Sequence, residues 1–123
     1  MADRAEKLSR EGLMSPNGAI PDVGMGWSLV GGYSLMSSLW GMGVDQVVGV
    51  RIVDARGEEK EWDESTEEGR EMMWAMKGAG MGNWGVVTEV RVRCYEMPVV
   101  GPRSALPIAL MAGLCLSAIR TTT

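Results

Sequence analysis

The chain has 123 residues, a length typical of one small domain or of a piece of a larger one. Hydrophobic residues make up 46% and charged residues 23% of the sequence, as in ordinary soluble globular proteins. The absence of histidine excludes Ser-His-Asp and Cys-His nucleophile pairs and histidine-ligated metal sites. The formal net charge of −4 argues against a nucleic-acid partner, which would require a basic surface.

Residues 2–40 are predicted to form two short helices joined by a turn and a loop. Residues 2–12 favour a short helix that ends at Gly12, which suits a helix C-cap. Residues 15–18 have the composition of a turn, and residues 22–32 form a glycine-rich apolar loop. Residues 33–40 are long enough for two helical turns.

A β-hairpin is predicted next. Residues 46–54 are β-branched and apolar, which predicts a strand with both faces covered. Residues 55–57 form a tight turn, and the polar residues 58–62 form the return strand at a sheet edge. One face of the first strand is expected to carry Val48, Val50 and Ile52, and the other Val47, Arg51 and Val53.

A helix is predicted from Ser65 to Lys77. Ser65 and Glu68 have the spacing of a capping box. Apolar or small residues at helical spacing predict its buried face, namely Gly69, Met72, Met73 and Met76. The eight carboxylates between Glu58 and Glu71 are interpreted as a solvated face.

A last strand is predicted over residues 86–94, because apolar and charged residues alternate there. The inward-facing set is expected to be Val86, Thr88, Val90, Val92 and Cys94. Cys94 and Cys115 are too few for a disulfide framework, and each is interpreted as a small buried residue. The predicted fold is α+β, a small mostly antiparallel sheet flanked by helices.

The C-terminal segment, residues 99–123, differs in character from residues 1–98 and is predicted to be a divergent tail. Its apolar run from Ala105 to Ile119 has 15 residues interrupted by Pro107. A membrane-spanning helix needs about 20 such residues, so a packed or amphipathic segment is favoured over a membrane anchor. The N-terminal ten residues lack the apolar stretch of a signal peptide, so none is expected in this sequence.

Two glycine clusters are the candidate ligand-binding elements. Residues 80–85 formally match GxGxxG, but a helix precedes and a strand follows, the reverse of a dinucleotide fingerprint. These glycines either form a turn or bring the backbone close to a flat ligand. The cluster at residues 24–32 has the same two interpretations.

Four linked blocks of the sequence carry a more specific signal. They are GGYS at residues 31–34, GMGVDQV at 41–47, ARG at 55–57 and MWAMKGAGMGNWGVVT at 73–88. In this order they resemble the FAD-linked oxidases of the p-cresol methylhydroxylase, vanillyl-alcohol oxidase and berberine-bridge-enzyme-like superfamily. The resemblance covers residues 5–98 and implies the second half of a PCMH-type FAD-binding domain, cut at both ends.

The resemblance also implies the residues that contact FAD. Gly31, Gly32, Tyr33 and Ser34 would line the flavin–ribityl side. Val44 and Asp45 would lie at the turn that follows. The third group would offer its backbone to the cofactor, with the valines near the adenine: Asn83, Gly85, Val86 and Val87.

By resemblance, the complete relatives are often secreted flavoproteins that move a hydride from a small alcohol, amine or sugar to FAD, with oxygen as oxidant. The first FAD subdomain, the substrate domain and the usual covalent-attachment residues are missing here. The expectation is therefore non-covalent FAD and a chain that is inactive alone. A degenerate scaffold that no longer binds FAD is the alternative, and the substrate stays open.

Overall fold

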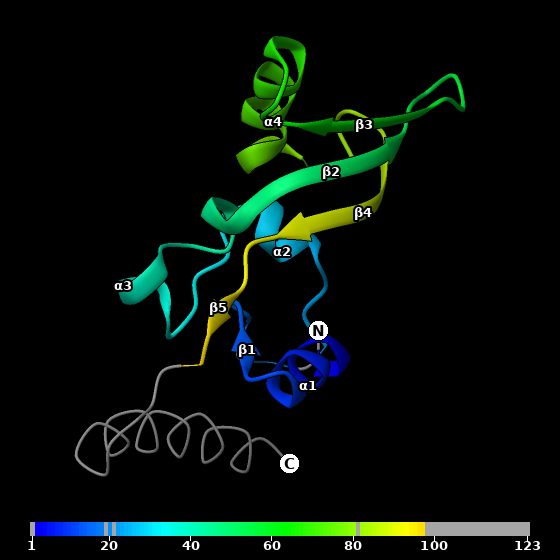
Figure 1. Ribbon diagram of the computed structural model, residues 1–123. Coiled ribbons are helices and arrows are strands. Elements are labelled where there is room, and N and C mark those ends of the chain that lie inside the picture. The colour runs from blue at the N-terminus through cyan, green and yellow to red at the C-terminus, as the bar shows by residue number, and fades with distance from the viewer. Residues whose placement is uncertain (1, 19, 21, 81, 98–123) are drawn as a thin grey trace, which may run out of the picture.

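The computed structural model describes residues 2–18, 20, 22–80 and 82–97 (Figure 1). A three-stranded antiparallel sheet has the order β3-β2-β4, from β2 (Val47–Val53), β3 (Glu59–Asp63) and β4 (Val86–Val92). A two-stranded sheet pairs β1 (Leu13–Met14) with β5 (Tyr95–Glu96). The α+β prediction is confirmed, and the predicted edge strand is β3. The predicted tail and Cys115 lie outside the described residues.

The helices are α1 (Ala2–Arg10), α2 (Gly26–Leu29), α3 (Ser37–Trp40) and α4 (Glu67–Ala79), with a 3-10 turn η1 (Val44–Gln46). The expected loop over residues 22–32 thus contains α2, and the helix expected over residues 33–40 is one turn long. Its start is delayed because Ser37 Oγ accepts from the Ser34 amide at 2.9 Å and Ser34 Oγ accepts from the Met36 amide at 3.2 Å. Such local side-chain bonds compete with helical ones.

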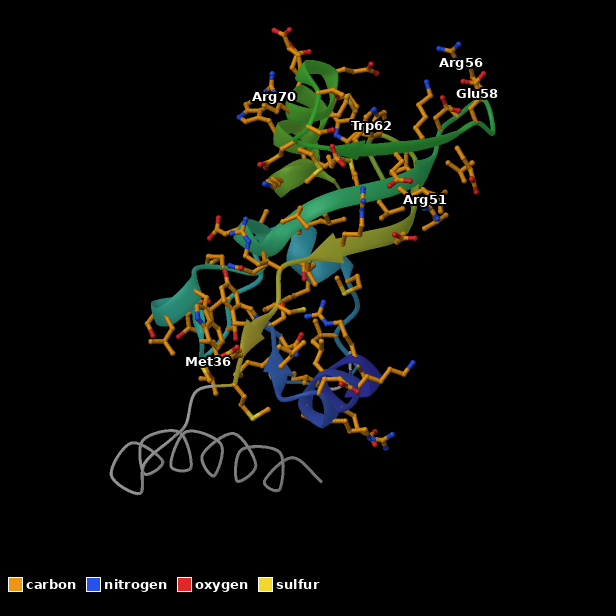
Figure 2. All side chains as sticks on the ribbon, in the orientation of Figure 1. Met36, Arg51, Arg56, Glu58, Trp62 and Arg70 are labelled. Atoms are coloured by element: carbon orange, nitrogen blue, oxygen red, sulfur yellow. The ribbon has the colours of Figure 1, made fainter. Side chains whose placement is uncertain are left out.

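The hydrophobic core lies on one face of the larger sheet, where α2 and α4 pack against β2. Its buried side chains come from these three elements and are Leu29, Val47, Val50, Ile52, Met73 and Met76. The opposite face is not covered by described residues, contrary to the expectation of two covered faces. Arg51 there lies 3.1 Å from Glu61 of β3 and 3.0 Å from Glu89 of β4. Figure 2 shows Arg51 on the sheet and Arg56 and Glu58 at the hairpin tip.

Two β-bulges change which side chains of the sheet face inward. The register between β2 and β4 shifts between Val47 and Gly49 and between Arg51 and Ile52, which leaves Val48 and Thr88 without a direct partner. An extra residue turns the side chains beyond it to the opposite face. Val48 is therefore only partly buried, although Val50 and Ile52 are buried as predicted.

On β4 the predicted inward face is wrong for the residues at and before the bulge, Val86 and Thr88. Val87 packs against the core together with Val90 and Val92, whereas Val86 is 70% exposed. The Thr88 hydroxyl donates to the Arg51 carbonyl oxygen at 3.2 Å, so it points at the ladder and not into the core. Cys94 follows the strand and is exposed, contrary to the expected buried role.

The N-cap of α4, the longest helix among the described residues, lies one residue after the predicted capping residue. Thr66, and not Ser65, is the N-cap: its Oγ1 accepts from the Gly69 amide at 3.0 Å. Ser65 bonds instead to the Asp63 carboxylate. The helical backbone is interrupted at Lys77 and Gly78, close to the predicted end.

We expect Thr66→Ala to lower the free energy of unfolding by about 1 kcal/mol, because the Gly69 amide loses its side-chain acceptor. Ser65→Ala is the matched control and should cost less than about 0.5 kcal/mol, since the Ser65 hydroxyl bonds to the exposed Asp63 side chain and not to a helix amide. Urea unfolding followed by circular dichroism measures both. Equal losses in the two variants would contradict the assignment of Thr66 as the cap.

A stacked aromatic pair joins β5 to α3. The Trp40 and Tyr95 rings stack with centroids 4.6 Å apart, and the Tyr95 hydroxyl donates to Gln46 Oε1 at 2.6 Å. The buried Gln46 amide donates to the carbonyl oxygens of Trp40 and Met42. The segment before β2 is thereby held to the segment after β4.

No helix among the described residues is both long and apolar enough to cross a membrane.

Candidate functional site

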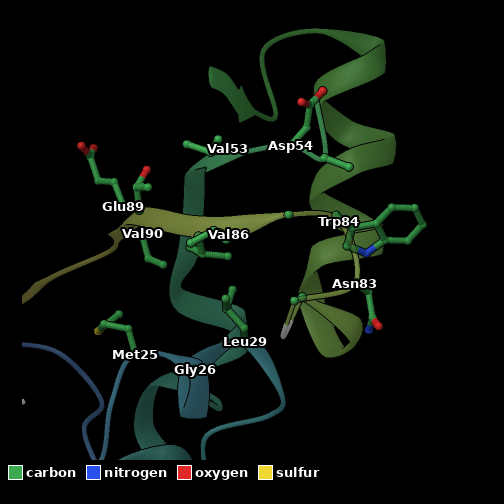
Figure 3. Close-up of a pocket in the computed structure, with 16 residues that line it drawn as sticks. Met25, Gly26, Leu29, Val53, Asp54, Asn83, Trp84, Val86, Glu89 and Val90 are labelled. Carbon is green, nitrogen blue, oxygen red and sulfur yellow. The ribbon is translucent and has the colours of Figure 1, made fainter. Parts of the chain in front are cut away.

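A cavity of about 810 Å³ lies between α2, the end of β2 and the start of β4 (Figure 3). We call it the first cavity, and ligand sites usually have volumes of this order. In Figure 3 Val86 and Val90 of β4 face Leu29 and Met25, while Asn83 and Trp84 lie at the other end. Its lining is Met25, Gly26, Leu29, Val53, Asp54, Ala55, Gly80, Gly82, Asn83, Trp84, Gly85, Val86, Val87, Thr88, Glu89 and Val90.

The glycine turn, residues 82–85, lines this cavity and packs against the end of β2. Gly85 has φ +143°, and a Cβ there would fall well inside 3.0 Å of the Val53 carbonyl oxygen. Asn83 Nδ2 donates to the Ala79 carbonyl oxygen at 2.7 Å, which ties the turn to the end of α4. The backbone amides of Asn83 and Trp84 have no hydrogen-bond acceptor among the described residues. Both residues line the cavity.

The charged side chains that line the first cavity are negative. Among the described residues, the lining includes Asp54 and Glu89 and no lysine or arginine. The backbone amides of Glu58 and Arg56 both donate to the Asp54 carboxylate. These bonds lower the pKa of Asp54 from its ordinary value, and the bond from Glu58 has the larger effect. This carboxylate is therefore ionised at neutral pH. The apolar wall suits an aromatic ring, whereas a phosphate would meet no opposite charge on a side chain here.

A second cavity of about 380 Å³ lies between α1, β1 and residues 33–36. It contains two predicted site residues, the 69% exposed Tyr33 and the buried Ser34. The described residues that line it are all uncharged: Ala5, Leu8, Ser9, Leu13, Met14, Ser15, Asn17, Gly18, Tyr33, Ser34, Leu35, Met36 and Met97.

The remaining predicted residues lie in a backbone junction that borders neither cavity. The Gly43 amide donates to the Gly32 carbonyl oxygen at 2.7 Å, and the Val44 amide donates to the Gly31 carbonyl oxygen at 2.9 Å. A Cβ at Gly43 would come within 2.8 Å of the Trp27 ring, which packs over the junction. Packing under Trp27 therefore accounts for glycine at this position.

The ten predicted site residues are thus divided among three places. Asn83, Gly85, Val86 and Val87 come together in the first cavity, and Tyr33 and Ser34 line the second. Gly31, Gly32, Val44 and Asp45 belong to the junction, where Asp45 Oδ2 accepts from the Met42 amide at 2.7 Å.

Sequence reasoning missed the α2 side of the first cavity. Met25, Gly26 and Leu29 were treated as part of a glycine loop, although the apolar residues among the glycines signalled a packed segment. No group of three or more metal-ligating side chains occurs in the part of the chain that the structure describes.

Comparison with known proteins identifies relatives that are much longer than this chain and match it over part of their length. The chain is 37% identical over 97 residues to (R)-6-hydroxynicotine oxidase of Paenarthrobacter nicotinovorans, which covers 78% of this chain and 20% of the relative. It is 34% identical over 95 residues to berberine bridge enzyme-like 11 of Arabidopsis thaliana, covering 76% and 17%. The chain therefore spans about one fifth of the length of these relatives. No family model matches.

Solved structures give the same result for the fold. The crystal structure of 6-hydroxy-D-nicotine oxidase from Arthrobacter nicotinovorans aligns with a TM-score of 0.70 at 35% identity, covering 76% of this chain and 20% of that one. A carbohydrate oxidase from Microdochium nivale aligns with a TM-score of 0.69 at 32% identity, again covering 76% and 20%. The fold is that of part of a VAO- or PCMH-type FAD-binding domain.

Proposed function

We propose that this chain, which is related in sequence and fold to the FAD-linked oxidases, supplies one wall of an FAD site in an FAD-dependent oxidoreductase. The observation that carries the proposal is the first cavity. Its apolar β4 wall and its glycine turn, where the Asn83 and Trp84 amides have no acceptor among the described residues, come from the same block, residues 73–88, that resembles these oxidases. From the acidic hairpin, only Asp54 and Ala55 of the described residues after Val53 line this cavity.

The residues present fit one part of FAD better than another. Val86, Val87 and Leu29 offer an apolar surface to a planar ring, and the amides of Asn83 and Trp84 offer donors at its edge. The pyrophosphate carries negative charge, and the cavity side chains oppose it with Asp54 and Glu89. This chain would therefore hold a ring of FAD, while another part of the enzyme neutralises the pyrophosphate.

The other predicted residues have supporting roles in this proposal. Gly31, Gly32, Val44 and Asp45 fix the junction under Trp27, and Tyr33 and Ser34 would meet the flavin–ribityl side. The two cavities do not merge among the described residues, so an extended FAD would have to bridge them. When bound, FAD would accept a hydride from a small alcohol, amine or sugar-type substrate, and the same family resemblance implies oxygen as the oxidant.

Non-covalent attachment is part of the proposal. The sequence has no histidine, and Cys94 lines neither cavity. Acid precipitation should therefore release all flavin from any preparation that carries it.

A chimera tests the proposal in a complete enzyme. The matching fifth of (R)-6-hydroxynicotine oxidase is replaced by residues 1–97 of this chain, and the flavin-to-protein ratio is measured. We expect a folded chimera that retains FAD. In its Val86→Glu variant, a charge on the apolar wall should weaken FAD binding at least about tenfold, equivalent to about 1.4 kcal/mol.

Val30→Glu is the matched control for that variant. Val30 is 50% exposed and lines neither cavity, so FAD affinity should change less than about twofold, well under 1 kcal/mol. A folded chimera without flavin would support the alternative, a scaffold that has lost FAD binding. Equal effects of the two glutamates would contradict the placement of FAD at Val86.

A further inference from the structure

The second cavity differs from the first in its charge and in its position along the chain. No charged side chain lines it, whereas Asp54 and Glu89 line the first. Its apolar residues come from α1, β1 and the segment before α3, and several remain open to solvent. Leu35 is 44% exposed and Met97 is 43% exposed. Apolar surface of this kind is stabilised when another apolar group covers it.

The described chain ends at this cavity. Met97 is the last described residue, and it lines the cavity together with Leu35 and Met36. Its backbone amide donates to the Gly12 carbonyl oxygen at 2.8 Å, directly after the pairing of β5 with β1. Any segment that follows Met97 therefore starts beside the cavity.

The residues that follow have a composition that matches the cavity. Residues 98–104, which separate Met97 from the apolar run in the sequence, include Arg103, and residues 105–119 carry no charge. This run includes Leu106, Ile108, Leu110 and Leu114. At about 380 Å³ the cavity has room for only some of these side chains. The short separation in sequence makes intramolecular contact favourable, since it gives the run a high effective concentration at the cavity.

We propose that the apolar run Ala105–Ile119 docks in the second cavity of the same molecule. The docked run leaves the first cavity open to FAD, but it competes with the proposed contact of Tyr33 and Ser34 with the flavin–ribityl side. A docked run covers Tyr33 and Ser34 and would exclude a ligand from them.

The native cysteines provide the test. In a Cys94→Ser chain, Cys115 is the single thiol and carries a nitroxide spin label, and paramagnetic broadening of backbone amide signals is measured in the full-length chain. We expect selective broadening at cavity residues such as Leu8, Leu13 and Leu35, and little at Glu67–Met76 of α4. Leu110→Asp together with Leu114→Asp should abolish the selective broadening, because the charged run no longer docks.

A disulfide experiment gives an independent result. Leu35→Cys in the Cys94→Ser chain should form an intramolecular disulfide with Cys115 under mild oxidation at least fivefold faster than Trp74→Cys. Trp74 is 82% exposed on α4 and borders neither cavity, so it is a matched surface control.

Two outcomes would overturn the proposal. One is uniform broadening together with equal disulfide rates for the two variants. The other is transfer of the broadening to isotope-labelled, cysteine-free chains mixed with spin-labelled ones, which would assign the cavity to a second copy.

Discussion

Replacing Gly85 by valine is expected to lower the free energy of unfolding by about 3 kcal/mol or more, with or without FAD. Gly85 has φ +143°, a backbone conformation that is strained for any residue with a side chain. A new Cβ would also overlap the Val53 carbonyl oxygen of β2. The glycine turn would have to move away from the sheet, and the first cavity would lose its closed end. Urea unfolding followed by tryptophan fluorescence measures the loss.

Gly24→Ala is the control for this substitution. Gly24 is exposed, its φ is not positive, and a Cβ there meets nothing within 4 Å. We expect a change within about 0.5 kcal/mol. If Gly85→Val were as stable as Gly24→Ala, the close packing of the turn against β2 would be wrong. Because Gly85→Val is expected to destabilise the fold itself, Val86→Glu is the better variant for testing where FAD binds.

The 123-residue chain alone, purified with excess FAD and then desalted, is expected to be colourless and without turnover. Ligand sites normally bury most of their ligand, and here the first cavity supplies one wall without a cationic side chain. Exposed apolar side chains, among them the 70% exposed Val86 and the 63% exposed Leu39, should also make the chain prone to self-association.

The absorption spectrum in the flavin bands and the mass of the desalted protein in solution check this expectation. The chimera described above, desalted in parallel, is the positive control for FAD retention. A monomeric yellow chain with one FAD per molecule, which also reduces oxygen with a small alcohol, would show that one wall is sufficient.

The part of the fold that could be predicted depends on local patterns. The β2–β3 hairpin and α4 were confirmed because β-branched runs, turn residues and helical spacing are properties of neighbouring residues. The capping residue was wrong by one position, since Ser65 and Thr66 both carry hydroxyls and only the path of the chain decides between them.

The errors on β4 and at the N-terminal side have a non-local cause. Alternation along β4 placed Val86 and Thr88 inward, but the bulge at Thr88 depends on how β4 pairs with β2. The pairing of β1 with β5 involves two residues on each strand, which is too short to produce a sequence pattern. These features arise from contacts between distant segments, which periodicity does not report.

The candidate site was predictable to the same extent. The glycine turn and the start of β4 were identified as one group, and they do border one cavity. The contribution of α2 was missed because Leu29 reaches the cavity through tertiary packing. The role of Trp27 over the glycine junction was missed for the same reason.

The pairing of β1 with β5 also bears on how such a unit could be accommodated in a longer polypeptide. Leu13 lies opposite Glu96, so the segment that follows α1 lies beside the last described strand (Figure 1). A unit whose first and last described strands pair can be inserted into a host chain with little distortion of either part. The same closure joins residues far apart in sequence, so it should form late in folding, after the hairpin and α4.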